Sequence, residues 1–239
     1  MDFEIIRKKF IEYSKKYDLK NINIMRKFHH SFRVMEYCKE IAKSLNLSNE
    51  DINLVMIIGL LHDIGRFEQW TKYNTYIDLN SIDHGDLSCD ILNDLLEESK
   101  YKNIILTAVK NHNKLKIEAN LDDKTLLFCK IIRDADKLDI IKEQNLIPKE
   151  NLDKVPNRII ECFKNKKLVY DANGDIEATF RQLAFIYDIH FKHTYEVLLK
   201  NKIIENKINL LKIYISDEEN IDYIFNSITN YINNKIQGE

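Results

Sequence analysis

The chain has 239 residues with 36 basic and 38 acidic side chains, so its formal net charge at neutral pH is −2. This balance excludes a strong overall field towards nucleic acid or an anionic membrane surface. The apolar runs are far shorter than the ~18 residues of a spanning helix. The segment Met1–Glu4 also lacks the pattern of a signal peptide. We therefore expect a cytoplasmic protein with no membrane partner and no stable nucleic-acid partner.

Glycine and proline are rare, with five and two copies, and apolar residues recur at three- and four-residue spacing. This combination predicts an all-α protein. We expect one domain over residues 1–239, with a core of motifs at about 26–143 and a helical C-terminal portion at about 156–236. The cysteines form no Cys-x-x-Cys pair, which indicates reduced core residues rather than zinc or redox ligands.

In chain order, Ser48 and Asp51 resemble a capping box at the start of a central helix, and Gly65 is expected to end that helix. Residues 67–82 lose the helical period and are predicted to form a long ordered loop, a kind of segment that often has a function. The segment with Pro148 and Pro156 is expected to be irregular. The predicted helices span residues 3–17, 26–45, 48–64, 83–96, 101–112, 122–137, 157–165, 176–200, 203–214 and 217–236.

The central helix contains the longest apolar stretch, Leu54–Leu61, followed directly by His62 and Asp63. Such a run cannot present a polar face to water, so we expect it to be buried on all sides. Ionisable groups at the end of a buried helix are costly unless they are paired, hydrogen-bonded or bound to a metal. The partners of His62 and Asp63 are therefore the main question that the sequence raises.

Several other ionisable residues fall on the apolar stripe of their own helix. His30, for example, is in helical register with Val34 and Cys38, whereas its neighbour His29 aligns with the charged Arg33. A single histidine on an apolar face is usually a hydrogen-bonded core residue, but several such residues together satisfy one another most economically through a metal. The residues on such stripes are His30, His62, His84, His112 and Asp136.

Imidazole and carboxylate ligands without thiolate suit first-row divalent ions such as iron, manganese, cobalt, nickel or zinc. Four of these ligands could hold one ion, and six could hold two. A carboxylate has two oxygens and can join two ions, so Asp63 is the natural bridging ligand.

At these residues the sequence resembles the HD-domain superfamily of metal-dependent phosphohydrolases. The resemblance covers roughly residues 28–139. It rests on a histidine, a His-Asp doublet and a distant aspartate, in the segments His30-Ser31-Phe32-Arg33-Val34, Leu60-Leu61-His62-Asp63-Ile64-Gly65-Arg66 and Arg133-Asp134-Ala135-Asp136-Lys137-Leu138-Asp139.

The resemblance implies an all-helical bundle in which His30, His62, Asp63 and Asp136 ligate one ion. His84 and His112 are similar to the additional ligands of the two-metal members. Three departures argue against specificity for cyclic dinucleotides. The chain has His112-Asn113 in place of a His-His pair, lacks a Gly-Tyr-Pro tripeptide, and has Arg66 in place of a lysine.

The expected activity is hydrolysis of a small phosphorylated substrate, such as a nucleotide, by a metal-activated water. Asp63 and Asp136 would contribute as ligands, and Arg66 would bind a phosphate oxygen through its planar guanidinium. Lys137 is a second candidate for the phosphate, and Tyr76 could stack on a base. Two alternatives stay open at this point, namely a di-iron oxygenase of the same fold and a non-catalytic nucleotide-binding module.

Overall fold

The computed structural model describes residues 1–143, 148 and 151–238. Its described ranges are helical and contain no β-strand, with an isolated bridge between Leu152 and Ile215. The predicted all-α class is confirmed. None of the helices that the structure describes combines the length and the hydropathy that a membrane crossing requires.

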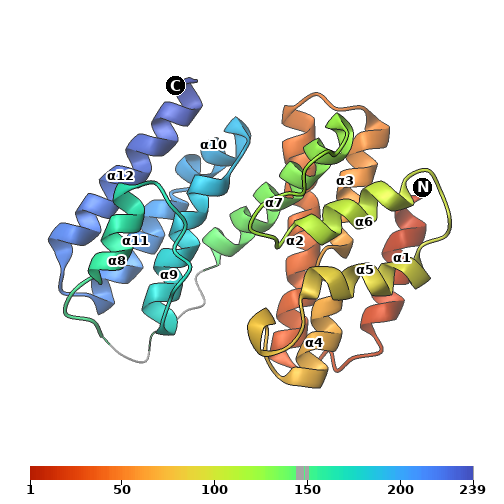
Figure 1. Ribbon diagram of the computed structural model, residues 1–239, viewed down its shortest axis with the longest axis horizontal. Helices are drawn as coiled ribbons and strands as arrows, with labels where there is room; N and C mark the ends of the chain where they lie inside the picture. Colours follow the sequence, from red (N-terminus) through yellow and green to blue (C-terminus); the bar gives the residue numbers. More distant parts are fainter. Residues whose placement is uncertain (144–147, 149–150, 239) are drawn as a thin grey trace. The chain divides into compact units, whose positions relative to one another are not determined.

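The chain divides into two compact units, residues 1–136 and 137–239. The expectation of a single domain stays a prediction. The first unit and the helix that ends it are shown in red to green in Figure 1. Its elements are α1 (Phe3–Ser14), α2 (Ile22–Ser44), α3 (Asn49–Leu61), α4 (Gly65–Tyr73), the 3-10 helix η1 (Asp78–Asn80), α5 (His84–Leu95), α6 (Lys102–Asn111) and α7 (Asp123–Lys142), which continues into the second unit.

Helices α2 and α3 pack along each other and form the centre of the first unit. Gly59 makes this close approach possible, because a Cβ atom there would lie 2.9 Å from both the Met35 Cα and the Cys38 Sγ. The apolar run Leu54–Leu61 is buried throughout, as predicted. Ser48 caps α3 and accepts a hydrogen bond from the Asp51 amide, also as predicted.

Two predictions in this unit need correction. Gly65 does not end the central helix: α3 stops at Leu61, and Gly65 begins α4 after a short turn. The segment 67–82 is not one loop, since α4 and η1 occupy most of it. Helix α4 is only nine residues long, and its helical conformation is supported by the fully buried Phe67 and an ion pair between Glu68 and Lys72.

The second unit consists of the end of α7 and the later helices. Its core contains large apolar side chains such as Phe163, Phe180 and Ile224. The helices are α8 (Asn157–Lys164), α9 (Gly174–Ala184), the 3-10 helix η2 (Phe185–Asp188), α10 (Lys192–Lys200), α11 (Ile203–Tyr214) and α12 (Glu218–Gln237).

The long helix predicted over residues 176–200 is wrong, because the chain breaks between α9 and α10. Ile189 and Phe191 adopt extended backbone conformations there. The Tyr195 hydroxyl compensates for lost helical bonds, since it lies 3.2 Å from the Ile186 carbonyl oxygen and 2.9 Å from the Ile189 carbonyl oxygen. The irregular stretch expected between Pro148 and Pro156 lies partly outside the described residues.

Candidate metal centre

The predicted ligands come together within the first unit. His30, on α2, and His62, directly after α3, lie close to Asp63 and Asp136. His84 is the first residue of α5, and His112 directly follows α6. All four histidines and Asp63 are buried, whereas the side chain of Asp136 is 16% exposed. His29 is exposed, in agreement with its charged face.

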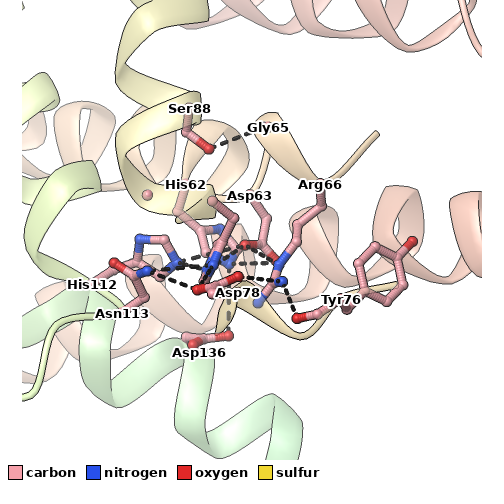
Figure 2. A network of polar contacts seen from close by, with 12 residues as sticks. His62, Asp63, Gly65, Arg66, Tyr76, Asp78, Ser88, His112, Asn113 and Asp136 are labelled. Carbon is pink, nitrogen blue, oxygen red and sulfur yellow. Dashed lines mark hydrogen bonds and ion pairs between the residues drawn. The ribbon is translucent and has the colours of Figure 1, made fainter. Parts of the chain in front are cut away.

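The four imidazole rings form a chain in the order His30, His62, His112 and His84. Neighbouring ring centroids are 5.1, 5.0 and 4.8 Å apart. The Asp63 carboxylate lies beside this chain, with Oδ2 facing His30 and His62 and Oδ1 facing His84 and His112. Figure 2 shows Asp63 with Arg66 and Tyr76 on one side and His112 and Asn113 on the other.

The first ligand group comprises His30, His62 and Asp136, next to Oδ2 of Asp63. The Nε2 atoms of His30 and His62 are 3.2 Å apart, and they lie 3.4 and 3.6 Å from Asp63 Oδ2. Asp136 Oδ1 is 3.1 Å from His30 Nε2 and 3.6 Å from His62 Nε2.

The second ligand group comprises His84 and His112, next to the other oxygen of Asp63. The two Nε2 atoms are 3.0 Å apart, and they lie 3.4 and 3.5 Å from Asp63 Oδ1. Counting the Asp63 oxygen on each side, four electron-rich atoms therefore converge in the first group and three in the second.

The protonation of the rings follows from their outer contacts. The Nδ1 atoms of His62 and His112 lie 2.8 and 2.6 Å from the carbonyl oxygens of Gly59 and Val109. A carbonyl oxygen can only accept, so each Nδ1 carries a proton. His84 Nδ1 likewise donates to Asp78 Oδ2 at 2.7 Å. In the neutral rings, Nε2 then has a free lone pair directed into the centre.

These donor atoms fit a divalent metal ion. Lone pairs of His84 and His112 that face each other at 3.0 Å repel unless a cation or a proton lies between them. Ligand distances of about 2.0–2.2 Å place neighbouring donors of one ion about 3–3.5 Å apart, which is close to the spacings observed in both groups. The outer hydrogen bonds that fix the rings of His62, His84 and His112 are also the usual support of a metal-bound histidine.

The electrostatics keep the ligands in their metal-binding protonation states. Burial raises the pKa of Asp63, but Lys27 and His62 outweigh this effect and hold the pKa well below its usual value. The pKa of Asp136 is also well below its usual value, because the neighbouring His30 and His62 outweigh the effect of burial. Burial, and then the charge of Arg66, lower the pKa of His84 to about 4. Ionised carboxylates and neutral imidazoles are the forms that bind metal.

Asp78, on η1, organises the surroundings of the second ligand group. Besides His84, it accepts hydrogen bonds from Gln69 Nε2 at 2.9 Å and from Arg66 Nη1 at 3.2 Å. Asn113 Nδ2 lies 3.3 Å from the same carboxylate and donates to Asp83, which caps α5. Asp78 therefore connects His84 to α4 and to the segment after α6.

Two glycines allow this arrangement. A Cβ atom at Gly65 would lie 2.9 Å from the His84 carbonyl oxygen and from the Ser88 Oγ, which accepts a hydrogen bond from the Gly65 amide. A Cβ atom at Gly85 would lie 2.4 Å from Asn113 Oδ1. Glycine at both positions lets α4, α5 and the Asn113 segment approach each other closely.

The residues predicted to bind substrate have protein partners in this structure. Arg66 Nη1 donates to Gln69 Oε1 and the Tyr76 carbonyl oxygen, both at 2.7 Å, as well as to Asp78. The Tyr76 hydroxyl donates to the Asn23 carbonyl oxygen, and the Tyr76 ring packs on Trp70. Lys137, in the second unit, forms an ion pair with Asp188 at 2.9 Å. The roles of Arg66, Tyr76 and Lys137 in substrate binding stay predictions.

Sequence reasoning assigned no role in the centre to four residues around it. Lys27 could have been found, because it lies one helical turn before His30. Arg133 could also have been found, since it precedes Asp136 on α7; it donates to the carbonyl oxygens of Asn111 and His112 at the end of α6. Asp78 and Asn113 lie in segments without a helical period, where the sequence carries no comparable signal.

The fold and the centre together define an all-helical protein with a buried histidine–aspartate site for divalent metal. Residues 28–141 match the family model of the HD domain. Residues 28–141 therefore carry an HD domain, the mark of a superfamily of metal-dependent hydrolases, and the predicted resemblance is confirmed. No curated protein and no solved structure matches the chain significantly.

Proposed function

We propose that the protein hydrolyses a small phosphoester with the aid of one or two divalent metal ions bound by His30, His62, Asp63, His84, His112 and Asp136. One observation carries this proposal. The ring nitrogens of four buried histidines converge on the two oxygens of Asp63, while outer contacts hold the proton of His62, His84 and His112 on Nδ1.

Two ions are favoured over one because Asp63 presents a different oxygen to each ligand group. Oδ2 faces His30 and His62, and Oδ1 faces His84 and His112. A carboxylate between two such groups is suited to bridge two ions. The ligand types favour iron, manganese, cobalt, nickel or zinc.

The charge balance favours an anionic substrate. Asp63, Asp78 and Asp136 all have lowered pKa values and are ionised at neutral pH. Lys27 and Arg66 lie against these carboxylates, and Arg26 lies against the same Tyr76 ring as both of them. The three cationic groups balance the three carboxylates, so each bound divalent ion makes the site more positive and attracts a phosphate.

When bound, such ions lower the pKa of a coordinated water and offset the negative charge that develops on a phosphate group. The protein residues hold the ligand atoms in position. The low pKa values of Asp63 and Asp136 make both carboxylates weak bases, so they serve better as ligands than as proton acceptors. Burial of the rings keeps bulk water away from their lone pairs, and Asp78 holds the proton of His84 on Nδ1.

The test combines metal analysis with a panel of mononucleotides, dinucleoside polyphosphates, cyclic nucleotides and sugar phosphates. We expect hydrolysis of at least one member, loss of activity with a chelator, and recovery with a first-row divalent ion. Oxygen consumption by anaerobically purified protein with a small polyol or phosphonate, without phosphoester cleavage, would replace the proposal with a di-iron oxygenase. Nucleotide binding without turnover under any divalent ion would indicate a regulatory module.

A further inference from the structure

Lys27 is the cation closest to the centre. It lies on α2 one turn before His30, and its Nζ is 2.7 Å from Asp63 Oδ2. That oxygen is the one shared with the first ligand group. The Lys27 side chain is only 14% exposed, so its charge needs a partner in this position.

A metal ion at Asp63 Oδ2 would compete with Lys27 for the same lone pairs. Two cations at one carboxylate oxygen repel each other, and the ammonium of a lysine is weakly directional and carried on a flexible stem. When the first ligand group binds its ion, Lys27 therefore requires a new or additional anion close to its present position.

The surroundings of Lys27 add positive charge to this place. Arg26, Lys27 and Arg66 each lie against the ring of Tyr76, with cation-to-centroid distances of 5.6, 5.5 and 5.4 Å. Arg66 Nη1 already donates to three protein acceptors. Arg66 Nε also lies 3.5 Å from Asp63, but at Oδ1, which faces the second ligand group. Lys27 lies 2.7 Å from Oδ2, so an ion at the first ligand group would displace Lys27, and Lys27 is the cation that a ligand can recruit.

We propose that Lys27 binds a non-bridging oxygen of the substrate phosphate once the first ligand group holds its ion. Its Nζ moves from Asp63 Oδ2 to the phosphate, which is thereby positioned next to His30 and His62. Arg26, exposed on the same turn of α2, adds long-range attraction for the phosphate. This inference rests on the proposed function and names the residue that takes over the phosphate-binding role expected of Arg66.

The test uses the metal-loaded protein, with inorganic phosphate as the probe in calorimetry and as an inhibitor of any hydrolysis found. In Lys27→Met we expect phosphate binding to weaken roughly 10- to 100-fold, the effect of losing one charge-assisted hydrogen bond. Metal stoichiometry should be unchanged, and the ion at the first ligand group should bind more tightly because a competing cation is gone. Lys27→Arg should recover part of the phosphate affinity.

Lys39→Met is the matched control, because Lys39 lies on the same helix and pairs with Glu36. It should change neither phosphate nor metal binding. Unchanged phosphate affinity in Lys27→Met would overturn the inference and leave Lys27 as a neutraliser of Asp63. Loss of metal in that variant would overturn it too, since Lys27 would then support the ligands.

The inference and the proposed function fail in different ways. If the wild-type protein binds phosphate but cleaves no phosphoester, the proposed function is wrong, and the phosphate titrations still decide the role of Lys27. If the protein cleaves a phosphoester and Lys27→Met binds phosphate normally, only the inference is wrong. If the loaded wild-type protein does not bind phosphate at all, the inference is overturned.

Discussion

The two ligand groups around Asp63 are built in different ways. The first group takes His30 and Asp136 from the interior of the long helices α2 and α7, and His62 from the end of α3. The second group takes His84 from the first residue of α5 and His112 from the residue that follows α6. Ring nitrogens nevertheless approach each other similarly, at 3.2 Å in the first group and 3.0 Å in the second.

The difference lies in what orients each group. Close packing of α2 on α3 positions His30 and His62, and Gly59 permits that packing. Hydrogen bonds position the second group: Asp78 orients His84, and Arg133 holds the carbonyl groups at the end of α6. We therefore expect the first group to depend on helix packing and the second on a polar network.

The largest effect on metal binding and activity is expected from a substitution of Asp63, which the two ligand groups share. Asp63→Asn keeps the shape of the side chain but removes the charge that both groups share. Both ions should be lost and activity should fall by more than about 100-fold, because even outer partners of metal ligands contribute about 10- to 100-fold. Metal analysis and a phosphoester assay measure this, and His29→Ala, with its exposed side chain, is the control. Retention of both ions would contradict the shared role of Asp63.

Removal of one second-group ligand should affect one ion only. His84→Ala or His112→Ala is expected to leave about one ion where the wild-type protein binds two, because Asp63 Oδ2 and the first group remain intact. Metal content after gel filtration tests this expectation. An unchanged content in both variants would show that the two groups are not separate sites.

The comparison also explains how much could be predicted from the sequence. The apolar stripes of α2, α3 and α7 predicted the helices and the inward positions of His30, His62 and Asp136, because burial leaves a periodic pattern. Tertiary hydrogen bonds leave no such pattern, so Asp78 was missed. The break between α9 and α10 was missed for the same reason, since the Tyr195 hydroxyl stabilises it by donating its one proton to the carbonyl oxygens of Ile186 and Ile189, and no glycine or proline lies in residues 185–191.

Acid should destabilise the metal-free protein. Burial lowers the pKa of His84 to about 4 and also lowers that of His62. Between about pH 6.5 and pH 4 the unfolded chain binds a proton at His84 that the folded protein does not bind. The free energy of unfolding should therefore decrease as the pH falls through this window, by about 3 kcal/mol from His84.

Denaturant unfolding of the metal-free protein at several pH values measures this loss. The carboxylates Asp63, Asp78 and Asp136 have lowered pKa values, so their stabilisation persists above about pH 4 and is lost only below it. His29→Ala should keep the full dependence. A stability that stays constant from pH 6.5 to pH 4 would show that the buried rings are already protonated at neutral pH.

The polar network of the second group can be tested without touching a ligand. Asp78→Asn keeps an acceptor near His84 Nδ1 but removes the negative charge that makes the ring a better ligand. The affinity of one ion should fall by about 10- to 100-fold, while the other ion is unaffected. Calorimetric titration measures both steps. Asp86→Asn is the control, because Asp86 lies on the same helix as His84 and pairs with Lys114. An equal loss of affinity for both ions would mean that Asp78 supports the whole centre.

Two glycine variants give the smallest effects and the most direct comparison. In Gly59→Ala the new Cβ meets backbone and sulfur atoms of α2, and in Gly65→Ala it meets backbone atoms at the start of α5. Each crowded contact should lower the free energy of unfolding by about 1–3 kcal/mol.

The two variants should then differ in which ion they bind with lower affinity. Gly59→Ala shifts α2 against α3 and should lower the affinity of the first ligand group for its ion. Gly65→Ala displaces His84 and should lower the affinity of the second ligand group for its ion. The His84→Ala titration identifies which binding step belongs to the second group. If both glycine variants weaken the same step, helix packing and hydrogen bonding do not act on separate halves of the centre, and the two groups respond as one rigid unit.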